Sequence, residues 1–269
     1  MVIHVASVSD PRLDDYRNIP DPELLRRRGI FIAEGRHVVR RLLTGSRFAA
    51  RSILVTPPAL ASLADVLGRF DRLPVYVVGQ DELNAVTGFN IHRGCLAVGA
   101  REPLPAWEAL AAGAARLLVL ERVANADNVG GLFRSAAAFG VEAVLLGPAC
   151  ADPLYRKAIR TSMGATLRVP FATLGTWPSD LERLKALGVR LLACTPAADA
   201  EPLPGVAPPP RTALLVGHEG EGLSAEAFAA ADARLRIPMA PGVDSLNVAT
   251  AAAIAMYGLW YGRPSLTSS

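Results

Sequence analysis

Four continuous apolar runs mark the second part of the chain, at residues 117–120, 143–146, 191–195 and 213–216. Short apolar runs separated by helical stretches are typical of strands that are buried on both faces of a parallel sheet. The pattern therefore predicts an α/β domain with a parallel sheet in this part of the chain.

Upstream, shorter apolar runs at residues 53–56, 74–78 and 95–99 alternate with stretches of helical periodicity at 57–70 and 80–87. This alternation predicts a second, smaller α/β domain ahead of the first.

The best candidate linker is REPLPA at residues 101–106, because its two prolines block regular hydrogen bonding. We therefore predict domains at 1–105 and 106–269, with residues 1–30 as a helical lead-in. The proline-rich stretch 196–211 is expected to be a surface loop.

The composition is that of a folded chain, with 269 residues, 51% hydrophobic and 20% charged, which excludes wholesale disorder and a disulfide-stapled miniprotein. Three separated cysteines predict no disulfide framework and favour a reducing, cytoplasmic location. The longest nearly apolar run, 248–261, is too short to span a bilayer. We predict no signal peptide, no membrane span and no metal site.

The net charge of +3 is too weak to identify a nucleic-acid binder, but its distribution is uneven. Residues 1–105 hold 14 basic and 11 acidic side chains, whereas residues 106–269 hold 14 of each. The whole surplus therefore lies in the first predicted domain.

Three polar clusters each follow an apolar strand of the second domain. The first, ERVANADNVGGLFR, offers Asn125, Asp127 or Asn128 as the cap of a helix that carries Arg134. Open α/β folds bind ligands at the C-terminal edge of the sheet, so Asn128 and Arg134 are candidate ligand contacts. Taken alone, the cluster also fits a capped helix with an exposed arginine.

The second cluster is LLVGHEGEGLS. Gly217, Gly220 and Gly222 allow a ligand to approach closely, and Glu219 stands among them. The GxxGxG spacing matches neither a Rossmann nor a Walker loop, so phosphate binding is disfavoured. The alternative is a glycine-rich turn before a helix capped by Ser224.

The third cluster, RIPMAPGVDSLNVATAAAIA, is a loop with prolines and a glycine before a helix of small residues. The helix is expected to start near Ser245 and Asn247, with Ser245 or Asp244 as its cap. A buried terminal helix is the alternative to a functional loop here.

Together these clusters resemble the motifs of the SpoU or TrmH-like branch of the SPOUT superfamily, which are S-adenosylmethionine-dependent RNA ribose 2′-O-methyltransferases. The matching segments are NVGGLFRSAAAFG at 128–140, LLVGHEGEGLS at 214–224 and IPMAPGVDSLNVATAAAIA at 237–255. Upstream, FIAEGRHVVRRLL and NIHRGCLAV resemble the ribosomal-protein-like RNA-binding domain often fused to this catalytic domain. Before about Phe31 the match is less clear.

The resemblance implies that residues 106–269 form a SPOUT methyltransferase domain with a deep trefoil knot, an exception to the usual avoidance of threaded chains. It also implies that this domain binds S-adenosylmethionine through five residues of the second and third clusters: Gly217, Gly222, Ile237, Ser245 and Leu246.

The family's catalytic set maps onto five polar residues: Asn128, Arg134, Glu219, Ser245 and Asn247. The implied reaction is an in-line attack of a ribose 2′-oxygen on the sulfonium methyl, for which alignment supplies much of the rate. A guanidinium is a poor base because its pKa exceeds ~12. We hypothesise that Arg134 binds the neighbouring phosphate and stabilises alkoxide charge, with Asn128 orienting it. His218 is assigned no catalytic role.

The RNA-binding hypothesis rests on residues 12–51, where 10 arginines face 5 acidic side chains. On a helix over 35–43, Arg36 and Arg40 share one face, and His37 and Arg41 share another, while the apolar residues turn inward. Phosphate neutralisation dominates nucleic-acid affinity. The candidate RNA contacts are Arg36, Arg40, Arg41 and Arg93. A solvated charged face is the alternative.

The resemblance further implies a homodimer through the C-terminal domain, with support from Met256, Trp260 and Tyr261 on its apolar terminal helix. The RNA substrate is tRNA or rRNA, and the sequence favours neither.

Two other functions stay open. A knotted RNA-binding protein, such as a ribosome-assembly factor, would not methylate, and the intact Arg134, Glu219 and Asn247 argue against it. A SPOUT base methyltransferase is expected to lack the Asn, Arg and Ser-Leu-Asn set. A nicotinamide-linked oxidoreductase is disfavoured by the glycine spacing.

Overall fold

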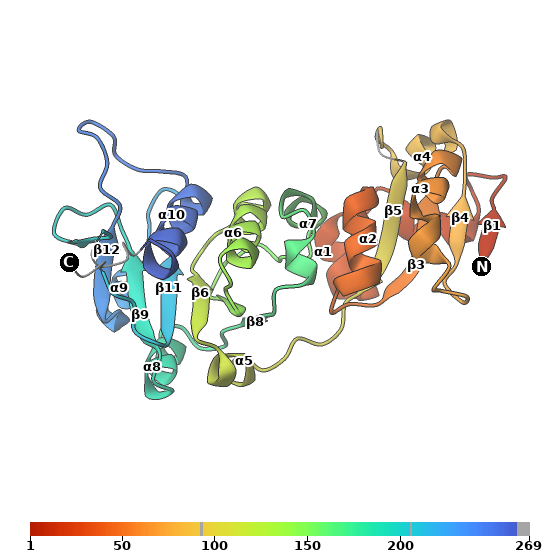
Figure 1. Ribbon diagram of the computed structural model, residues 1–269. Helices are drawn as coiled ribbons and strands as arrows, with labels where there is room; N and C mark the ends of the chain where they lie inside the picture. The colour runs from red at the N-terminus through yellow and green to blue at the C-terminus, as the bar shows by residue number, and fades with distance from the viewer. Residues whose placement is uncertain (92–93, 205, 263–269) are drawn as a thin grey trace, which may run out of the picture. The chain divides into compact units, whose positions relative to one another are not determined.

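The computed structural model describes residues 1–91, 94–204 and 206–262, which divide into two compact units (Figure 1). Unit 1 comprises Met1–Pro103 and Pro153–Arg168, and unit 2 comprises Leu104–Asp152 and Val169–Ser269. The assignment of RNA binding to residues 1–105 and of methyl transfer to residues 106–269 stays a prediction. None of the described helices is both long and apolar enough to cross a membrane.

Unit 1 is built on a five-stranded mixed sheet in the order β1-β4-β3-β5-β2, in which β5 runs antiparallel to both of its neighbours. Its strands are β1 (Val2–His4), β2 (Ile30–Glu34), β3 (Ala50–Val55), β4 (Val75–Val77) and β5 (Cys95–Ala100). Its helices and helical turns are η1 (Pro11–Tyr16), α1 (Asp21–Glu23), η2 (Leu24–Arg28), α2 (Arg36–Gly45), α3 (Pro57–Leu67), α4 (Gln80–Thr87), α7 (Arg156–Thr161) and η3 (Ala165–Leu167). The predicted strands and helices between residues 53 and 99 are confirmed, whereas β2 was missed.

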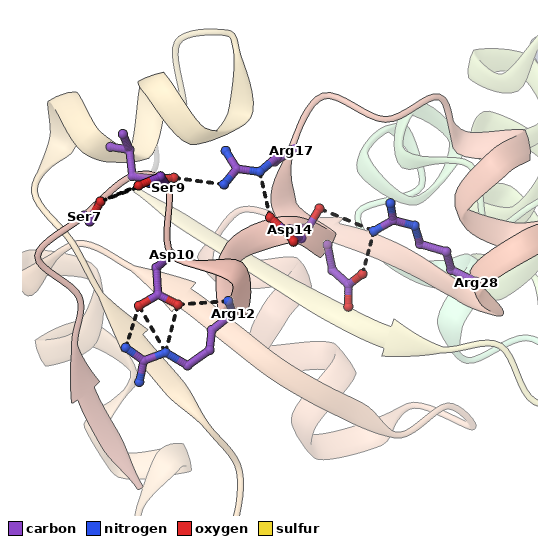
Figure 2. Close-up of polar contacts among 9 residues, drawn as sticks. Ser7, Ser9, Asp10, Arg12, Asp14, Arg17 and Arg28 are labelled. Atoms are coloured by element: carbon purple, nitrogen blue, oxygen red, sulfur yellow. Dashed lines mark hydrogen bonds and ion pairs between the residues drawn. The ribbon is translucent and has the colours of Figure 1, made fainter.

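The segment 1–30, predicted as a helical lead-in, holds a strand as well as helical turns. The chain begins with β1, which extends the sheet by pairing parallel with β4, and only short helical turns follow. Local ion pairs fix this segment (Figure 2): Arg12 with Asp10, Arg17 with Asp14, and Arg28 with Asp15. Hydrogen bonds from Arg12 hold the pKa of Asp10 at about 2. Strand pairing and local charge pairs therefore order the segment where helical periodicity is weak.

Unit 2 has a seven-stranded sheet in the order β10-β12-β9-β11-β6-β7-β8, and every pair is parallel, as predicted. Its strands are β6 (Arg116–Leu120), β7 (Ala143–Leu146), β8 (Phe171–Thr173), β9 (Arg190–Cys194), β10 (Glu201–Pro202), β11 (Thr212–Val216) and β12 (Ala233–Arg236). Its helices are α5 (Trp107–Gly113), α6 (Ala126–Ala138), α8 (Ser179–Ala186), α9 (Ala225–Ala230) and α10 (Val248–Trp260).

The strands that the apolar pattern missed in unit 2 are short or charged. β8 has three residues, β10 has two, and β12 carries Arg234 and Arg236. The described residues of the predicted loop 196–211, which are 196–204 and 206–211, form a loop apart from β10, whose two residues pair with β12.

The strand order of unit 2 fixes the place of a ligand site. β6 is the first strand of this sheet along the chain, and it lies between β7 on one side and β11 on the other. The order of the strands reverses there, and in open α/β sheets ligands bind beyond the C-terminal ends of the strands at such a switch point. The first two polar clusters follow β6 and β11 directly.

Substitution of Gly99 in β5 would test how tightly unit 1 is packed. A Cβ atom at Gly99 would lie 2.1 Å from Cζ of the buried Phe31 ring. Overpacking of this kind typically costs about 1–3 kcal/mol, and we expect Gly99→Ala to lower the free energy of unfolding by that amount in urea titrations followed by circular dichroism.

The control is Gly113→Ala at the end of α5, where a Cβ atom would meet nothing within 4 Å. We expect no loss of stability there. Equal urea midpoints for Gly99→Ala and the natural chain would contradict this account of the packing.

Candidate functional site

A single cavity in unit 2 brings the second and third polar clusters together. Its walls come from the end of β9, the loop after β11 and the loop before α10. Five of its lining residues are those predicted to contact the cofactor: Gly217, Gly222, Ile237, Ser245 and Leu246. The two loops, which are distant in sequence, therefore share one cavity at the C-terminal edge of the sheet.

The loop after β11 closes into a tight turn, residues 217–223, called the glycine turn below. The backbones of His218 and Gly222 exchange two hydrogen bonds of 3.0 and 2.9 Å. A Cβ atom at Gly217 would lie 2.4 Å from backbone atoms of Gly222 and Leu223. Only glycine permits this approach of backbone to backbone, and Gly222 itself has a φ of +71°.

The His218 side chain stabilises the glycine turn, to which it belongs, through hydrogen bonds with the backbone of the turn. Its Nδ1 accepts hydrogen bonds from the backbone N–H groups of Gly220 at 3.0 Å and Glu221 at 3.1 Å. Nδ1 thus satisfies two backbone donors of the turn, while Nε2 takes no part in these bonds. His218 also lines the cavity.

Two residues that directly follow β6 stabilise the same turn through contacts with residues 221–224. The Glu121 side chain, 2% exposed, accepts a hydrogen bond from the backbone N–H of Ser224 at 2.8 Å. Arg122 forms an ion pair with Glu221 at 2.6 Å and donates to the carbonyl of Gly222 at 3.4 Å. Arg122 adopts a φ of +55°, which is uncommon outside glycine.

Three predicted catalytic residues form a chain of hydrogen bonds across the clusters. Asn247 Nδ2 donates to Asn128 Oδ1 at 2.9 Å, and Asn128 Nδ2 donates to Glu219 Oε1 at 2.6 Å. This chain of two hydrogen bonds, called the relay below, joins α6, the glycine turn and the start of α10. It fixes both amide groups and leaves the Glu219 carboxylate at the cavity wall.

The caps of the helices explain how the relay is positioned. Asn125 caps α6 by accepting from Asp127 N–H at 2.9 Å, which leaves the Asn128 side chain for the relay. The prediction that Ser245 or Asp244 caps the last helix is wrong. Asn247 caps α10, accepting from two backbone N–H groups, while its amide nitrogen serves the relay. Ser245 lines the cavity instead.

Arg134 lies apart from the relay. It is exposed on α6, six residues after Asn128, and it does not line the cavity. At about 1.5 Å of rise per residue, six residues place it about 9 Å further along the helix. Within the described residues of the single chain, no hydrogen bond joins it to Asn128. The relay and Arg134 thus form two separate parts of the predicted catalytic set.

The charged residues that line the cavity favour one kind of ligand over others. Among the residues that line it, Glu219 is the one carboxylate and there is no lysine or arginine. Apolar side chains, including Val216, Ile237, Met239 and Leu246, form much of the remaining wall. Such a wall suits a cationic ligand with an apolar body and disfavours a phosphate-bearing dinucleotide, which proteins usually bind with cations or glycine-rich phosphate loops.

Other chemistries find little support in the described residues. Burial raises the pKa of the Cys194 thiol, which lines the cavity, to about 11, so it is a protonated thiol at neutral pH. The described part of the chain contains no group of three or more His, Cys, Asp or Glu arranged to hold a metal ion.

The predicted RNA contacts that the structure describes are in unit 1, and two of them, Arg40 and Arg41, already have partners. Arg40 forms a two-pronged ion pair with Asp65, which lowers the pKa of that carboxyl. Arg41 donates to the carbonyl of Met163. Arg36 is exposed at the start of α2. Arg93 lies outside the described residues.

Sequence reasoning missed three residues of the site. His218 was assigned no role, and Glu121 and Arg122 were passed over, although all three fasten the glycine turn. Only their position in the sequence could have identified them. Glu121 and Arg122 directly follow β6, and His218 follows β11 by two residues.

Comparison with known proteins agrees with this geometry. The model of the SpoU rRNA Methylase family matches residues 115–257. An uncharacterized tRNA/rRNA methyltransferase of Mycobacterium tuberculosis is 46% identical over 260 residues, which cover 94% of this chain and 90% of the relative. The 23S rRNA (guanosine(2553)-2'-O)-methyltransferase RlmP of Bacillus subtilis is 27% identical over 255 residues, covering 95% and 98%.

Among solved structures, the AdoMet-bound rRNA methyltransferase from Sinorhizobium meliloti has the same fold. The TM-score is 0.79 at 23% identity, and the match covers 96% of this chain and 97% of that chain. More than half of the sequence thus matches one family model, and nearly all of it aligns with the mycobacterial relative. The chain belongs to the SpoU rRNA methylase family.

Proposed function

We propose that the chain transfers the methyl group of S-adenosylmethionine to a ribose 2′-hydroxyl of tRNA or rRNA. The observation that carries this proposal is the convergence of the second and third family motifs on one cavity, to which Asn128 of the first motif is joined by its hydrogen bonds with Glu219 and Asn247. The RlmP relative, by its name, methylates the 2′-oxygen of a guanosine in 23S rRNA.

The cavity fits S-adenosylmethionine by its chemistry. The apolar wall suits the adenine ring, backbone groups of the glycine turn suit its edge and the ribose, and Glu219 supplies a negative charge for a cationic donor. Gly217, Gly222, Ile237, Ser245 and Leu246 would hold the donor. When bound, S-adenosylmethionine supplies an electrophilic methyl group on a sulfonium.

The chain's own residues align the attacking oxygen and manage its charge. In the reaction the O–CH₃ bond forms as the S–CH₃ bond breaks, S-adenosylhomocysteine leaves, and the hydroxyl proton passes to the neighbouring RNA phosphate and from there to water. The Asn247–Asn128 pair fixes the orientation of Glu219 at the cavity wall, where its carboxylate would face a cationic donor. Arg134 holds the phosphate beside the target ribose through its planar fork of donors and stabilises alkoxide charge.

The homodimer is part of this proposal, because Arg134 does not line the cavity of its own chain. Ile254, Tyr257 and Tyr261 form an exposed apolar stripe on α10, at helical spacing. Phe139 of α6 packs against both tyrosines. A second copy would cover this stripe, and the Arg134 of one copy would serve the cavity of the other.

The stripe differs from the one expected from the sequence. Met256 is fully buried, and Trp260 is half-buried beside Arg116, so neither forms the dimer surface we propose. Tyr261 is exposed, as expected. We also propose a cytoplasmic location, which an RNA substrate and three free cysteines support. The trefoil knot stays a prediction.

Arg134→Ala is expected to reduce methylation of total cellular RNA at least about 100-fold, the loss typical when a group that stabilises developing charge is removed. The affinity for S-adenosylmethionine should stay within about twofold by isothermal titration, because Arg134 lies outside the cavity. Arg134→Lys keeps the charge without the planar fork and should recover only part of the rate. Full turnover by Arg134→Ala would remove this assignment.

His218→Ala removes the acceptor of two backbone N–H groups, and unsatisfied donors of this kind weaken the turn enough to lower S-adenosylmethionine affinity about tenfold. In His218→Asn the side-chain Oδ1 takes the place of Nδ1 and restores the acceptor. We expect the asparagine variant to bind nearly as the natural chain does in isothermal titration. If both variants bind alike, His218 does not position the turn.

Tyr257→Asp places a charge in the exposed stripe and is expected to convert a dimer into a monomer of 28.4 kDa in light scattering, with loss of methylation. Leu187→Asp is the control, since Leu187 is exposed at the end of α8. A natural chain that is monomeric and fully active would contradict the dimer.

A further inference from the structure

The division of the chain into units changes where its charge lies. Unit 1 holds 18 Lys and Arg against 11 Asp and Glu, a net charge of +7, whereas unit 2 holds 10 against 14, a net charge of −4. The segment Pro153–Arg168 contributes four of the cations of unit 1 and no carboxylate. A segment that comes between the first and second methyltransferase motifs in sequence thus makes the other unit strongly basic.

This segment forms one wall of a hollow in unit 1, called the α7 hollow below. Residues of α7 face residues of the N-terminal part across a cavity of about 320 Å³. The side chains that carry the argument are Glu34, Phe89, Arg156, Lys157 and Arg160. All of them are remote in sequence from the relay and from the glycine turn.

Arg156 and Phe89 line one side of the α7 hollow and form its platform. The Arg156 guanidinium lies over the Phe89 ring, with 5.4 Å between its carbon and the ring centroid. Asp21 steadies it, accepting from the Arg156 backbone N–H at 2.8 Å and lying 3.9 Å from Nε. Unpaired RNA bases stack on aromatic rings and on arginine planes of this kind.

The rim of the α7 hollow carries two exposed cations three residues apart on α7, Lys157 and Arg160. The Arg160 side chain is 54% exposed, and its ion pair with Glu34 is loose at 3.7 Å. Glu34 Oε2 is buried and has no hydrogen-bond partner among the described residues. Because the pair is longer than a hydrogen bond, Arg160 keeps its donors for an incoming anion.

We propose that the α7 hollow binds one nucleotide of the substrate RNA. The phosphate lies on Arg160 and Lys157, and the base stacks on the Arg156–Phe89 platform. Glu34 competes with the phosphate for Arg160, so it limits the affinity of the site. The assignment to substrate RNA rests on the proposed function, whereas binding of RNA to the hollow is tested independently of it.

The test uses fluorescence anisotropy of the full chain with a labelled, mixed-sequence RNA of about 12 nucleotides, because single-stranded sites typically span about 4–16 nucleotides. Lys157→Ala/Arg160→Ala is expected to lower the affinity about tenfold. It should also reduce the slope of log affinity against log salt by about 0.7, since the site binds one phosphate and each phosphate of a single strand contributes about that much. Arg69→Ala, an exposed arginine at the end of α3, is the control and should change affinity less than about twofold.

Two further variants separate a nucleotide site from simple attraction of charge. Phe89→Leu keeps an apolar side chain and should lower the affinity about fivefold with an unchanged salt slope, because it removes stacking and no charge. Glu34→Gln frees Arg160 and should raise the affinity about two- to threefold. Thermal melts check that each variant is folded.

The proposal fails if the double variant binds RNA with the natural affinity and salt slope, or if Phe89→Leu and Glu34→Gln leave the affinity unchanged. Failure of the proposed function is distinct: it would be a natural chain that binds RNA but methylates none. If both proposals hold, the double variant raises the KM for RNA and leaves kcat and S-adenosylmethionine affinity unchanged.

Discussion

The approach of backbone to backbone at Gly217 is the constraint on which the site depends. A side chain there would displace Gly222 and Leu223, and the turn between them could not close. The closed turn presents Glu219 to the relay and its own backbone to the cavity. Contacts from His218 inside and from Glu121 and Arg122 outside hold it in this shape, so the site rests on one short loop fastened from two sides.

The sheet of unit 2 explains why distant motifs meet at that loop. β6 and β11 are parallel neighbours, and the clusters that follow them emerge at the same edge. α10 packs against α6 (Figure 1), which brings its cap Asn247 within hydrogen-bond distance of Asn128. The relay therefore follows from strand order and from the packing of two helices, and it couples both to the glycine turn.

Much of this could be predicted from the sequence, because buried parallel strands are continuous apolar runs and the family motifs name the residues that line the cavity. What could not be predicted depends on tertiary contacts. β1 and β12 are too short or too charged to be apolar runs, yet each is fixed by pairing. Asn247 rather than Ser245 caps α10, because the relay holds it there. The place of Pro153–Arg168 in unit 1 depends on packing that no local pattern encodes.

The central claim is that the glycine turn and the Ser-Leu-Asn loop bind one donor together. Co-crystallisation of the chain with S-adenosylhomocysteine tests this most directly. The account predicts the product bound between Gly217 and Leu246, with its sulfur toward Glu219. Density at another site, or an empty cavity at millimolar ligand in a crystal that leaves it open, would contradict it.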